Sequence, residues 1–231
     1  MFSRIMGGRG KQTFKPMKSH KSKKRQELST MKRTTLGTGS MLATVVLPAG
    51  ESLDEWLAVH VVDFYNDVSL MYGLVSEDAA SLFTKAGEGF PPGFEYRWSS
   101  GKGVVRCTGA EYVDYCMTWV DAQISNEEVF PTLADQPFAD DFADHVKLIM
   151  KRIFRVFAII YGQEPLFDIF ASVEAAPHLN TSFKHFIYFA LEFGLVGSAE
   201  FKAIPKKMQE MNGEYKQAKA EMEAGGGEAK E

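Results

Sequence analysis

The chain has 231 residues, 45% of them hydrophobic and 24% charged, which is typical of one folded domain with loose ends. A net charge of −4 argues against a dedicated nucleic-acid-binding protein, and no apolar run reaches membrane-spanning length. The start, MFSRIMGGRGKQ, lacks the apolar stretch of a secretory signal, so we expect the chain in the cytoplasm or nucleus. The two cysteines are too few for a disulfide framework or a cysteine-built zinc site.

Charge is distributed unevenly along the chain. Residues 1–33 hold eleven basic residues and one acid, a net charge of +10, whereas residues 34–205 have a net charge of −13. Because the first segment has few apolar positions, we expect 1–33 to be a basic disordered N-terminal tail. We assign the folded domain to 34–205 and expect 206–231 to form a helix followed by a disordered, glycine-rich tail.

Apolar residues at helical spacing predict a helix over 53–71. Residues 76–93 lack any period and contain Pro91-Pro92-Gly93, so they predict a long loop. FEYRW and VVRC flank a Ser-Ser-Gly-Lys-Gly turn, which predicts a β-hairpin.

The second half of the chain is predicted to be helical. A capping box at Thr108 opens a helix that ends before Phe130. Further helices are predicted over about 142–161 and from Asn180 to about Gly194. We therefore expect an all-α fold, a helical bundle with a four-helix core, extra helices, one short β-hairpin and long loops.

The helix over 53–71 has an acidic face opposite its core stripe. Glu51, Glu55, Val59 and Asp63 lie at steps of four, with Trp56 beside them. A solvated acidic surface is the ordinary interpretation. The mixture of acidic and apolar residues also suits a docking site for a basic amphipathic helix of a partner.

The helix over 142–161 carries a basic cluster. Lys147, Lys151, Arg152 and Arg155 are four of only ten basic residues in 34–205. Cations are favourable toward the C-terminal half of any helix, so this too can be a plain solvated face. The alternative is a phosphate-binding site, with a phosphopeptide, an inositol phosphate or nucleic acid as ligand.

Enzymatic motifs are missing from the sequence. There is no glycine-rich phosphate loop, no GxSxG and no HExxH, and the five histidines are scattered. We therefore expect no enzyme, no catalytic residues and no cofactor.

Several ordered blocks resemble the MOB (Mps-one-binder) family of kinase co-activators. They are LPAGESLDEWLAVHVVDFYNDVSLMYG, EYRW, EYVDYCMTWV, VFP, KRIFRVFAIIYGQ and HLNTSFKHFIYFALEFGL. Together they extend over roughly residues 11 to 201 and look closest to the founding subfamily, which activates NDR/LATS-type kinases. The resemblance implies a non-catalytic helical bundle that binds the N-terminal regulatory region of an AGC-type kinase.

The resemblance also implies functional residues. The family's kinase-binding face matches Glu51, Glu55, Trp56, Val59, Asp63 and Phe64. Its phosphopeptide pocket, which binds phosphothreonine in upstream Ste20/Hippo-type kinases or scaffolds, matches Lys151, Arg152 and Arg155. Thr13 and Thr35 match threonines that are phosphorylated in animal members. The implied processes are mitotic exit, cytokinesis and growth control through Hippo signalling, and we expect a monomer in the cytoplasm, nucleus, or spindle pole or centrosome.

The sequence departs from the family at its structural zinc site. The four ligand positions match Ala79, Thr84, Ile159 and Glu164, so we expect the protein to fold without zinc. Leu82, Phe83 and Phe90 could hold the 76–93 loop by packing near Ile159, or the loop could be mobile.

Two other functions compete with kinase activation. Divergent members of the family serve as scaffold subunits of striatin-type phosphatase and kinase assemblies, although Asp63 within VVDFYN favours kinase activation. The basic tail alternatively suits nucleic acid or an anionic membrane. Within the first interpretation, we expect the tail to lie loosely against the acidic domain and to compete with the kinase for Glu51, Glu55 and Asp63.

Overall fold

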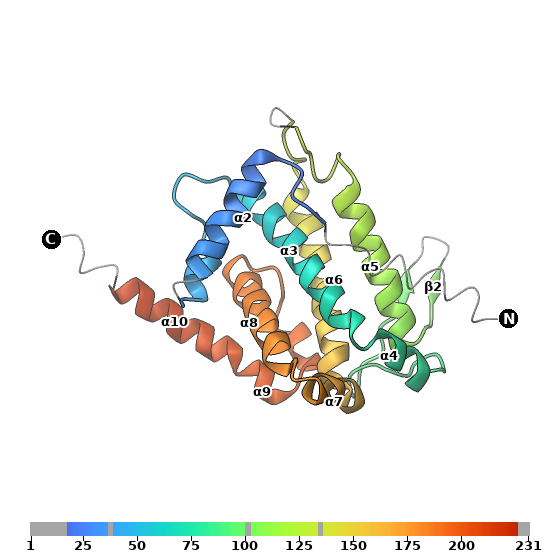
Figure 1. Ribbon diagram of the computed structural model, residues 1–231. Helices are drawn as coiled ribbons and strands as arrows, with labels where there is room; N and C mark the ends of the chain where they lie inside the picture. The colour runs from blue at the N-terminus through green and yellow to red at the C-terminus, as the bar shows by residue number, and fades with distance from the viewer. Residues whose placement is uncertain (1–17, 37–38, 100–102, 134–135, 226–231) are drawn as a thin grey trace.

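The computed structural model describes residues 18–36, 39–99, 103–133 and 136–225 (Figure 1). Its helices are α2 (Lys23–Leu36), α3 (Leu53–Gly73), α4 (Ser76–Leu82), α5 (Gly109–Ser125), α6 (Phe142–Gly162), α7 (Glu164–Ser172), α8 (Ala176–Glu192), α9 (Lys206–Gln209) and α10 (Met211–Gly225), with short 3-10 helices η1 (Leu42–Thr44) and η2 (Glu200–Ala203). Strands β1 (Trp98–Ser99) and β2 (Val104–Val105) pair antiparallel, with Trp98 opposite Val105. The predicted all-α fold with one short hairpin is confirmed. In the part of the chain that is described, no helix has the length and apolar character needed to cross a membrane.

Helices α3, α5, α6 and α8 form the central bundle. In Figure 1, α3 lies between α2 on one side and α5 on the other, and it packs most extensively against α6. Aromatic rings fill the space between α3, α6 and α8: Phe64, Phe157, Phe183, Phe186 and Phe189 are all fully buried. This core fixes the two helices that carry the predicted binding faces, α3 and α6.

Side-chain caps set the starts of α3 and α5. Ser52 Oγ accepts a hydrogen bond from the Glu55 backbone N–H at 3.5 Å. At α5, Thr108 and Glu111 form the reciprocal bonds of the predicted capping box, at 3.1 and 2.9 Å. Such caps each stabilise a helix by about 1 kcal/mol, and they fix the register of the side chains that follow.

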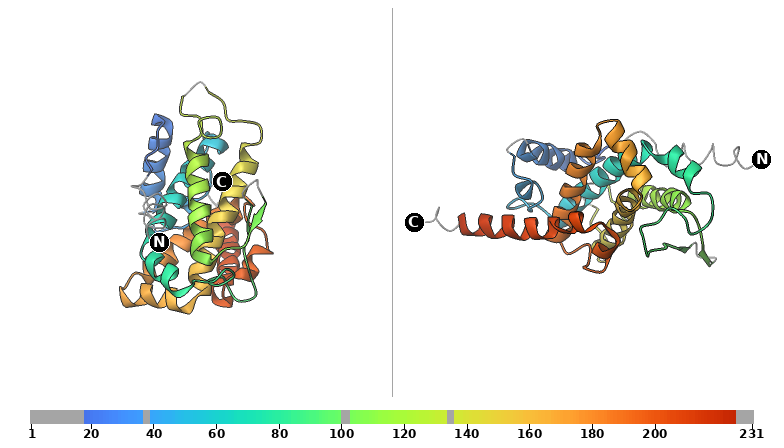
Figure 2. Two further views of the ribbon diagram at one scale, coloured as in Figure 1. Left: turned by 90° about the vertical axis from the view of Figure 1, so that its right-hand side faces the viewer. Right: turned by 90° about the horizontal axis from the view of Figure 1, so that it is seen from below.

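The N-terminal segment differs most from its prediction. Disorder over 1–33 is wrong for Lys23–Arg33, which lie in α2, whereas residues 1–17 lie outside the described part. At the other end the predicted helix is present as α9 and α10, and Figure 2 shows α10 extending away from the bundle beyond its contacts with α8.

Residues 76–93 also differ from a plain loop, because Ser76–Leu82 form α4. The rest of the segment is tied down by the Gly109 N–H bond to the Glu88 carbonyl at 2.8 Å and by packing of Phe90. Phe90 is buried against Tyr96 as well as the core, whereas Leu82 is 51% exposed. Phe90, and in part Phe83, thus pack against the core as expected, whereas the expected packing of Leu82 is wrong.

The matched zinc positions do not suit a metal. Ala79 and Ile159 are buried and have no donor atom, while Thr84 and Glu164 are exposed. The end of α6 is joined to the loop in another way, since Gln163 Nε2 donates to the Phe90 carbonyl. Gly162 lies so close to the loop that a side chain there would meet Pro91 Cα at 2.7 Å. These contacts occupy the place where a metal tether would act.

We predict that a chelator leaves the melting temperature unchanged, whereas Gln163→Ala lowers it. The substitution leaves the Phe90 carbonyl without its donor, at a cost of about 1–2 kcal/mol. Gln217→Ala is the matched control, because Gln217 is exposed and its side chain bonds to Glu221 on the same helix. A large chelator-induced loss of stability, or stoichiometric zinc in the purified protein, would contradict the expectation.

Candidate functional site

The acidic face of α3 is occupied by the N-terminal segment of the same chain. Three carboxylates, Glu51 just before α3 and Glu55 and Asp63 on it, each pair with a cation. Lys24 Nζ lies 2.5 Å from Glu51, Arg25 Nε lies 2.6 Å from Glu55, and Lys32 Nζ pairs with Asp63. The predicted row of acids therefore exists as a binding face. Its ligand here is α2, whose cations Arg25 and Lys32 are buried against it.

Arg25 is the most deeply enclosed of these cations, with 4% of its surface exposed. Besides Glu55, its guanidinium donates to the Pro131 carbonyl at 2.7 Å and lies 5.1 Å from the centre of the Phe138 ring. A buried cation is tolerated only where its donors are satisfied, and here a carboxylate, a carbonyl and an aromatic face supply that.

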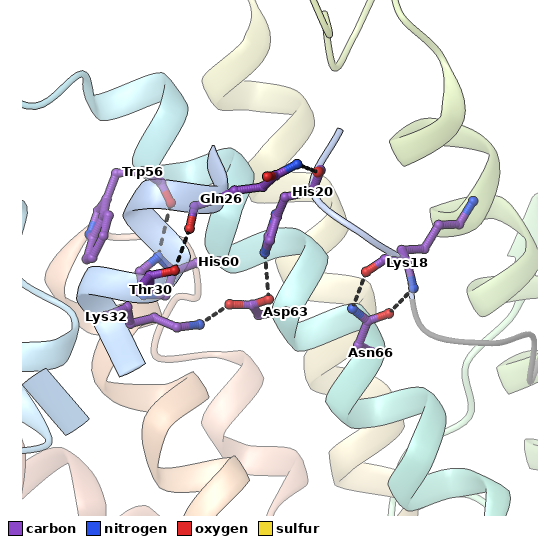
Figure 3. A network of polar contacts seen from close by, with 9 residues as sticks. All are labelled: Lys18, His20, Gln26, Thr30, Lys32, Trp56, His60, Asp63 and Asn66. Atoms are coloured by element: carbon purple, nitrogen blue, oxygen red, sulfur yellow. Dashed lines mark hydrogen bonds and ion pairs between the residues drawn. The ribbon is translucent and has the colours of Figure 1, made fainter. Parts of the chain in front are cut away.

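Asp63 lies between two arms of the N-terminal segment (Figure 3). His20, before α2, donates from Nε2 at 3.0 Å, and Lys32, near the end of α2, approaches the other oxygen. Burial acts to raise the pKa of Asp63, but the His20 hydrogen bond and the Lys32 charge outweigh it and hold that pKa well below its usual range.

The extended residues before α2 are held along α3 and α5. Asn66 bonds both backbone groups of Lys18, accepting from its N–H at 2.8 Å and donating to its carbonyl at 2.9 Å (Figure 3). Lys18 Nζ reaches α5, where it lies 2.7 Å from Ser125 Oγ and 3.0 Å from Asp121. Sequence reasoning missed Asn66 and Asp121, because neither belongs to the row of acids at steps of four.

The apolar members of the predicted face are not on the surface. Trp56 is 1% exposed and donates its indole N–H to the Val45 carbonyl at 3.0 Å. Val59 and Phe64 are fully buried, Phe64 against rings of α8. The expectation that Trp56 and Val59 lie exposed among the acids is wrong, because both are buried in the core, whereas burial of Phe64 agrees with its place at helical spacing among the core-facing residues of this helix.

The basic cluster of α6 is built around two arginines held by aromatic rings. Arg152 is sandwiched between Trp98 of β1 and Trp119 of α5, 4.3 and 4.2 Å from the ring centres. Arg155 donates to the Tyr112 hydroxyl at 2.9 Å. The structure thus brings both arginines to one side of α6 and fixes their positions, which the charge count alone did not indicate.

Lys151, the third member of the predicted pocket, pairs with Glu200 of η2 at 3.6 Å, and Lys147 one turn earlier is exposed. Burial lowers the pKa of the Arg152 guanidinium, whose buried Nε has no hydrogen-bond partner within the described chain. An anion bound here would compete with the Glu200 carboxylate for Lys151 and meet a preformed pair of arginines.

The predicted phosphorylation sites lie at the edges of the described part. Thr13 lies outside it, and Thr35 falls in the last turn of α2. A phosphate is unfavourable at the C-terminal end of a helix, since the carbonyls there carry partial negative charge.

Asp67, one turn beyond Asp63, has a pKa of about 6, raised chiefly by burial and further by the Asp63 charge against the opposing effect of Lys32. The pKa is higher in the folded than in the unfolded state, so ionisation of Asp67 destabilises the fold as the pH rises through about 6. Ionisation of Asp63 has the opposite effect on stability, because its pKa is lower in the folded than in the unfolded state. The ionised carboxylate therefore stabilises the fold at pH values above the pKa of the unfolded state, and this stabilisation is lost as the pH falls.

We predict opposite effects of two matched substitutions on thermal unfolding. Asp67→Asn should stabilise the protein by about 1–3 kcal/mol at pH 8 and have little effect at pH 4. Asp63→Asn should destabilise it by about 3 kcal/mol at pH 8, because the Lys32 cation is left without its partner, and the loss should shrink in acid. Equal shifts of the same sign at both pH values would contradict these roles.

Residues 33–204 match the Mob1/phocein family. The MOB kinase activator-like 1 homolog A of Dictyostelium discoideum is 40% identical over 200 residues, 84% of this chain and 91% of that protein. The MOB kinase activator-like 1A of Arabidopsis thaliana is 40% identical over 216 residues, 90% of this chain and 97% of that protein. Both α3 and α6 lie within the matched region. The chain therefore belongs to the Mob1/phocein family and, within it, to the founding subfamily of MOB kinase activators.

Proposed function

We propose that this protein is a non-catalytic adaptor that activates an NDR/LATS-type AGC kinase by binding the kinase's N-terminal regulatory region. The observation that carries the proposal is the acidic face of α3, where Glu51, Glu55 and Asp63 hold a basic helix. A kinase segment with the same charge and shape would fit the same carboxylates. The relatives named MOB kinase activators support this role.

The second part of the proposal concerns α6. Arg152 and Arg155, preordered by aromatic neighbours, bind a phosphothreonine of an upstream Ste20/Hippo-type kinase or scaffold. The arginines of α6 lie against β1 and α5, whereas the acids of α3 face α2, so one adaptor can hold both proteins. The processes served are mitotic exit, cytokinesis or growth control, in the cytoplasm, the nucleus, or at a spindle pole or centrosome.

The N-terminal segment regulates the first face. Since α2 pairs with Glu51, Glu55 and Asp63, it must leave before a kinase segment can bind, and the apparent affinity is reduced by the fraction of molecules in which α2 is docked. Phosphate at Thr35 weakens docking through repulsion from the C-terminal end of α2 and by lowering the net positive charge of the basic segment. Phosphate at Thr13 acts by lowering the charge of the basic segment.

The scaffold role in a striatin-type assembly is the alternative. It is disfavoured by Asp63, which both arms of the N-terminal segment contact, and by the names of the relatives. Nucleic-acid binding by the basic tail is weakened as a proposal, since four of the tail's cations already pair with carboxylates on α3, on α5 and just before α3.

We predict that the double substitution of Arg25 and Lys32 by Ala in the full chain tightens binding of a kinase N-terminal segment by about tenfold. The gain arises because α2 loses its two most buried ion pairs and no longer blocks the face. Isothermal titration with N-terminal segments of NDR/LATS-type kinases measures it, alongside stimulation of kinase activity.

Lys23→Ala is the matched control, because the Lys23 side chain is 91% exposed and pairs with Glu27 of the same helix. It removes charge but should leave affinity unchanged. Glu55→Lys should abolish kinase binding in the double variant. In that variant the pair between Arg25 and Glu55 is already absent, so the substitution cannot raise affinity by releasing α2 and shows only the loss of the kinase contact. Kinase binding that persists with Glu55 reversed would rule out this face.

We predict that Arg155→Ala abolishes the preference for a phosphothreonine peptide over its unphosphorylated twin, a loss of at least about tenfold, while the kinase segment still binds. Lys147→Ala, on the exposed part of the same helix, should have a smaller effect. A melting curve of each variant separates loss of the pocket from loss of the fold. Retained phosphate preference in Arg155→Ala would place the phosphate elsewhere.

A further inference from the structure

The basic cluster of α6 also contains a carboxylate. Lys151 lies 3.6 Å from Glu200 of η2, and both side chains are partly exposed, at 35% and 21%. We propose that Glu200 gives this site both signs of charge, so that it selects a phosphothreonine with a lysine or arginine close to it in the peptide. This inference rests on the proposed function, since it takes the phosphothreonine site on α6 as given and names the kind of peptide that the site prefers.

Glu200 is held at the cluster by its own short helix. The next residue, Phe201, is buried, and its ring centre lies 5.7 Å from that of Phe154 on α6. The Glu200 backbone N–H donates to the Gly197 carbonyl at 3.2 Å, and a side chain at Gly197 would begin 3.1 Å from Glu200 Oε2. The carboxylate thus has a fixed place, with one oxygen toward Gly197 and the other toward Lys151.

The charge of Glu200 also extends to the neighbourhood of Arg155. Burial raises the pKa of Tyr96, the Arg155 charge opposes that effect, and the Glu200 charge adds to it. Arg155 lies 5.1 Å from the centre of the Tyr96 ring. Since the same tyrosine is within range of both charges, an anion bound by Arg155 and Lys151 would lie close to a fixed carboxylate.

Phosphate binding changes the partners of Lys151. A phosphothreonine carries a charge of about −1.5 to −2 and makes charge-assisted hydrogen bonds with lysine and arginine. Because Lys151 then has two anionic partners, the phosphate and the Glu200 carboxylate repel each other. A cation on the peptide beside the phosphate removes this repulsion, since it pairs with the carboxylate that Lys151 partly releases. The preferred ligand therefore carries both charges.

The rest of the domain favours the same kind of ligand. Residues 34–205 have a net charge of −13, so the field around the site repels a strongly negative ligand. A phosphopeptide with a basic residue escapes much of this repulsion. Inositol phosphates and nucleic acids have no cation to place beside Glu200, so the arrangement disfavours two of the three ligands that the charge of α6 alone allows.

The first test measures binding of labelled phosphothreonine peptides to the full chain by fluorescence anisotropy. A single lysine is placed in turn at each position flanking the phosphothreonine of an otherwise uncharged peptide, and each peptide has a twin with glutamate there. At the position that reaches Glu200, the lysine peptide should bind at least about threefold more tightly than its twin. The Glu200→Gln variant should lose this preference.

Glu223→Gln is the matched control, because it removes the same charge from an exposed position on the part of α10 that extends away from the bundle (Figure 2). It should leave the preference for lysine as it is in the unaltered chain. A preference that persists in Glu200→Gln would show that the field of the whole domain, and not Glu200, selects the peptide. Equal binding of the twins at every position would equally overturn the proposal.

The second test compares three probes of the Glu200→Gln variant. Inositol hexakisphosphate and the phosphopeptide without other charges should each bind about threefold more tightly than to the unaltered chain, because repulsion by Glu200 is gone. The best lysine peptide should not gain, since it loses its partner. Damage to the fold cannot tighten binding, and an equal gain for all three probes would contradict the proposal. An oligonucleotide that binds the unaltered chain more tightly than every peptide would assign the site to nucleic acid and overturn it.

The outcomes separate this inference from the proposed function. A preference for phosphorylated over unphosphorylated peptides, without any effect of a neighbouring lysine, would leave the phosphothreonine site intact and refute only the selection by Glu200. Equal binding of phosphorylated and unphosphorylated peptides would refute the phosphothreonine site, and the inference with it.

Discussion

The pairing of buried cations on α2 with carboxylates on α3 is the interaction on which the arrangement of this protein depends. Arg25 and Lys32 are almost completely enclosed, and each has a carboxylate partner on α3. Removal of one partner leaves a buried charge uncompensated, which is far more costly than loss of a surface ion pair. A segment with little intrinsic tendency to fold is therefore ordered by the surface it covers, and that surface is closed by the same contact.

The two functional faces use opposite charges but different kinds of support. On α3 the carboxylates are supplied with cations by the chain itself, so a ligand has to displace α2. On α6 the arginines are positioned by rings, with Arg152 between Trp98 and Trp119. The rings hold the guanidinium of Arg152 without neutralising its charge, so the charge stays available to an anion. Lys151 differs, because its ammonium group pairs with the Glu200 carboxylate. One face is covered by a segment of the same chain, and the other is preorganised by aromatic rings.

The hairpin and the 76–93 segment contribute to the second face from a distance. Trp98 comes from β1, and Phe90 packs against Tyr96, the residue over which Arg155 lies at 5.1 Å. The bond from Gln163 to the Phe90 carbonyl thus ties the end of α6 to the segment that lines its own basic cluster. Loss of metal ligands is compatible with an ordered pocket, because backbone hydrogen bonds and close packing at Gly162 hold the same pieces of chain.

The sequence by itself determined the all-α class, the hairpin, the capping box at Thr108 and the rows of acids and bases on α3 and α6. These features follow from periodicity and from contacts between residues a few positions apart, which local sequence encodes. Only the tertiary structure decided that Trp56 and Val59 are buried, that Asn66 clamps Lys18, and that two tryptophans enclose Arg152. It also decided that α2 is a helix, because its stability comes from carboxylates about thirty residues away. Charge pairs and packing between distant segments leave no periodic trace in the sequence, so the folded chain is needed to reveal them.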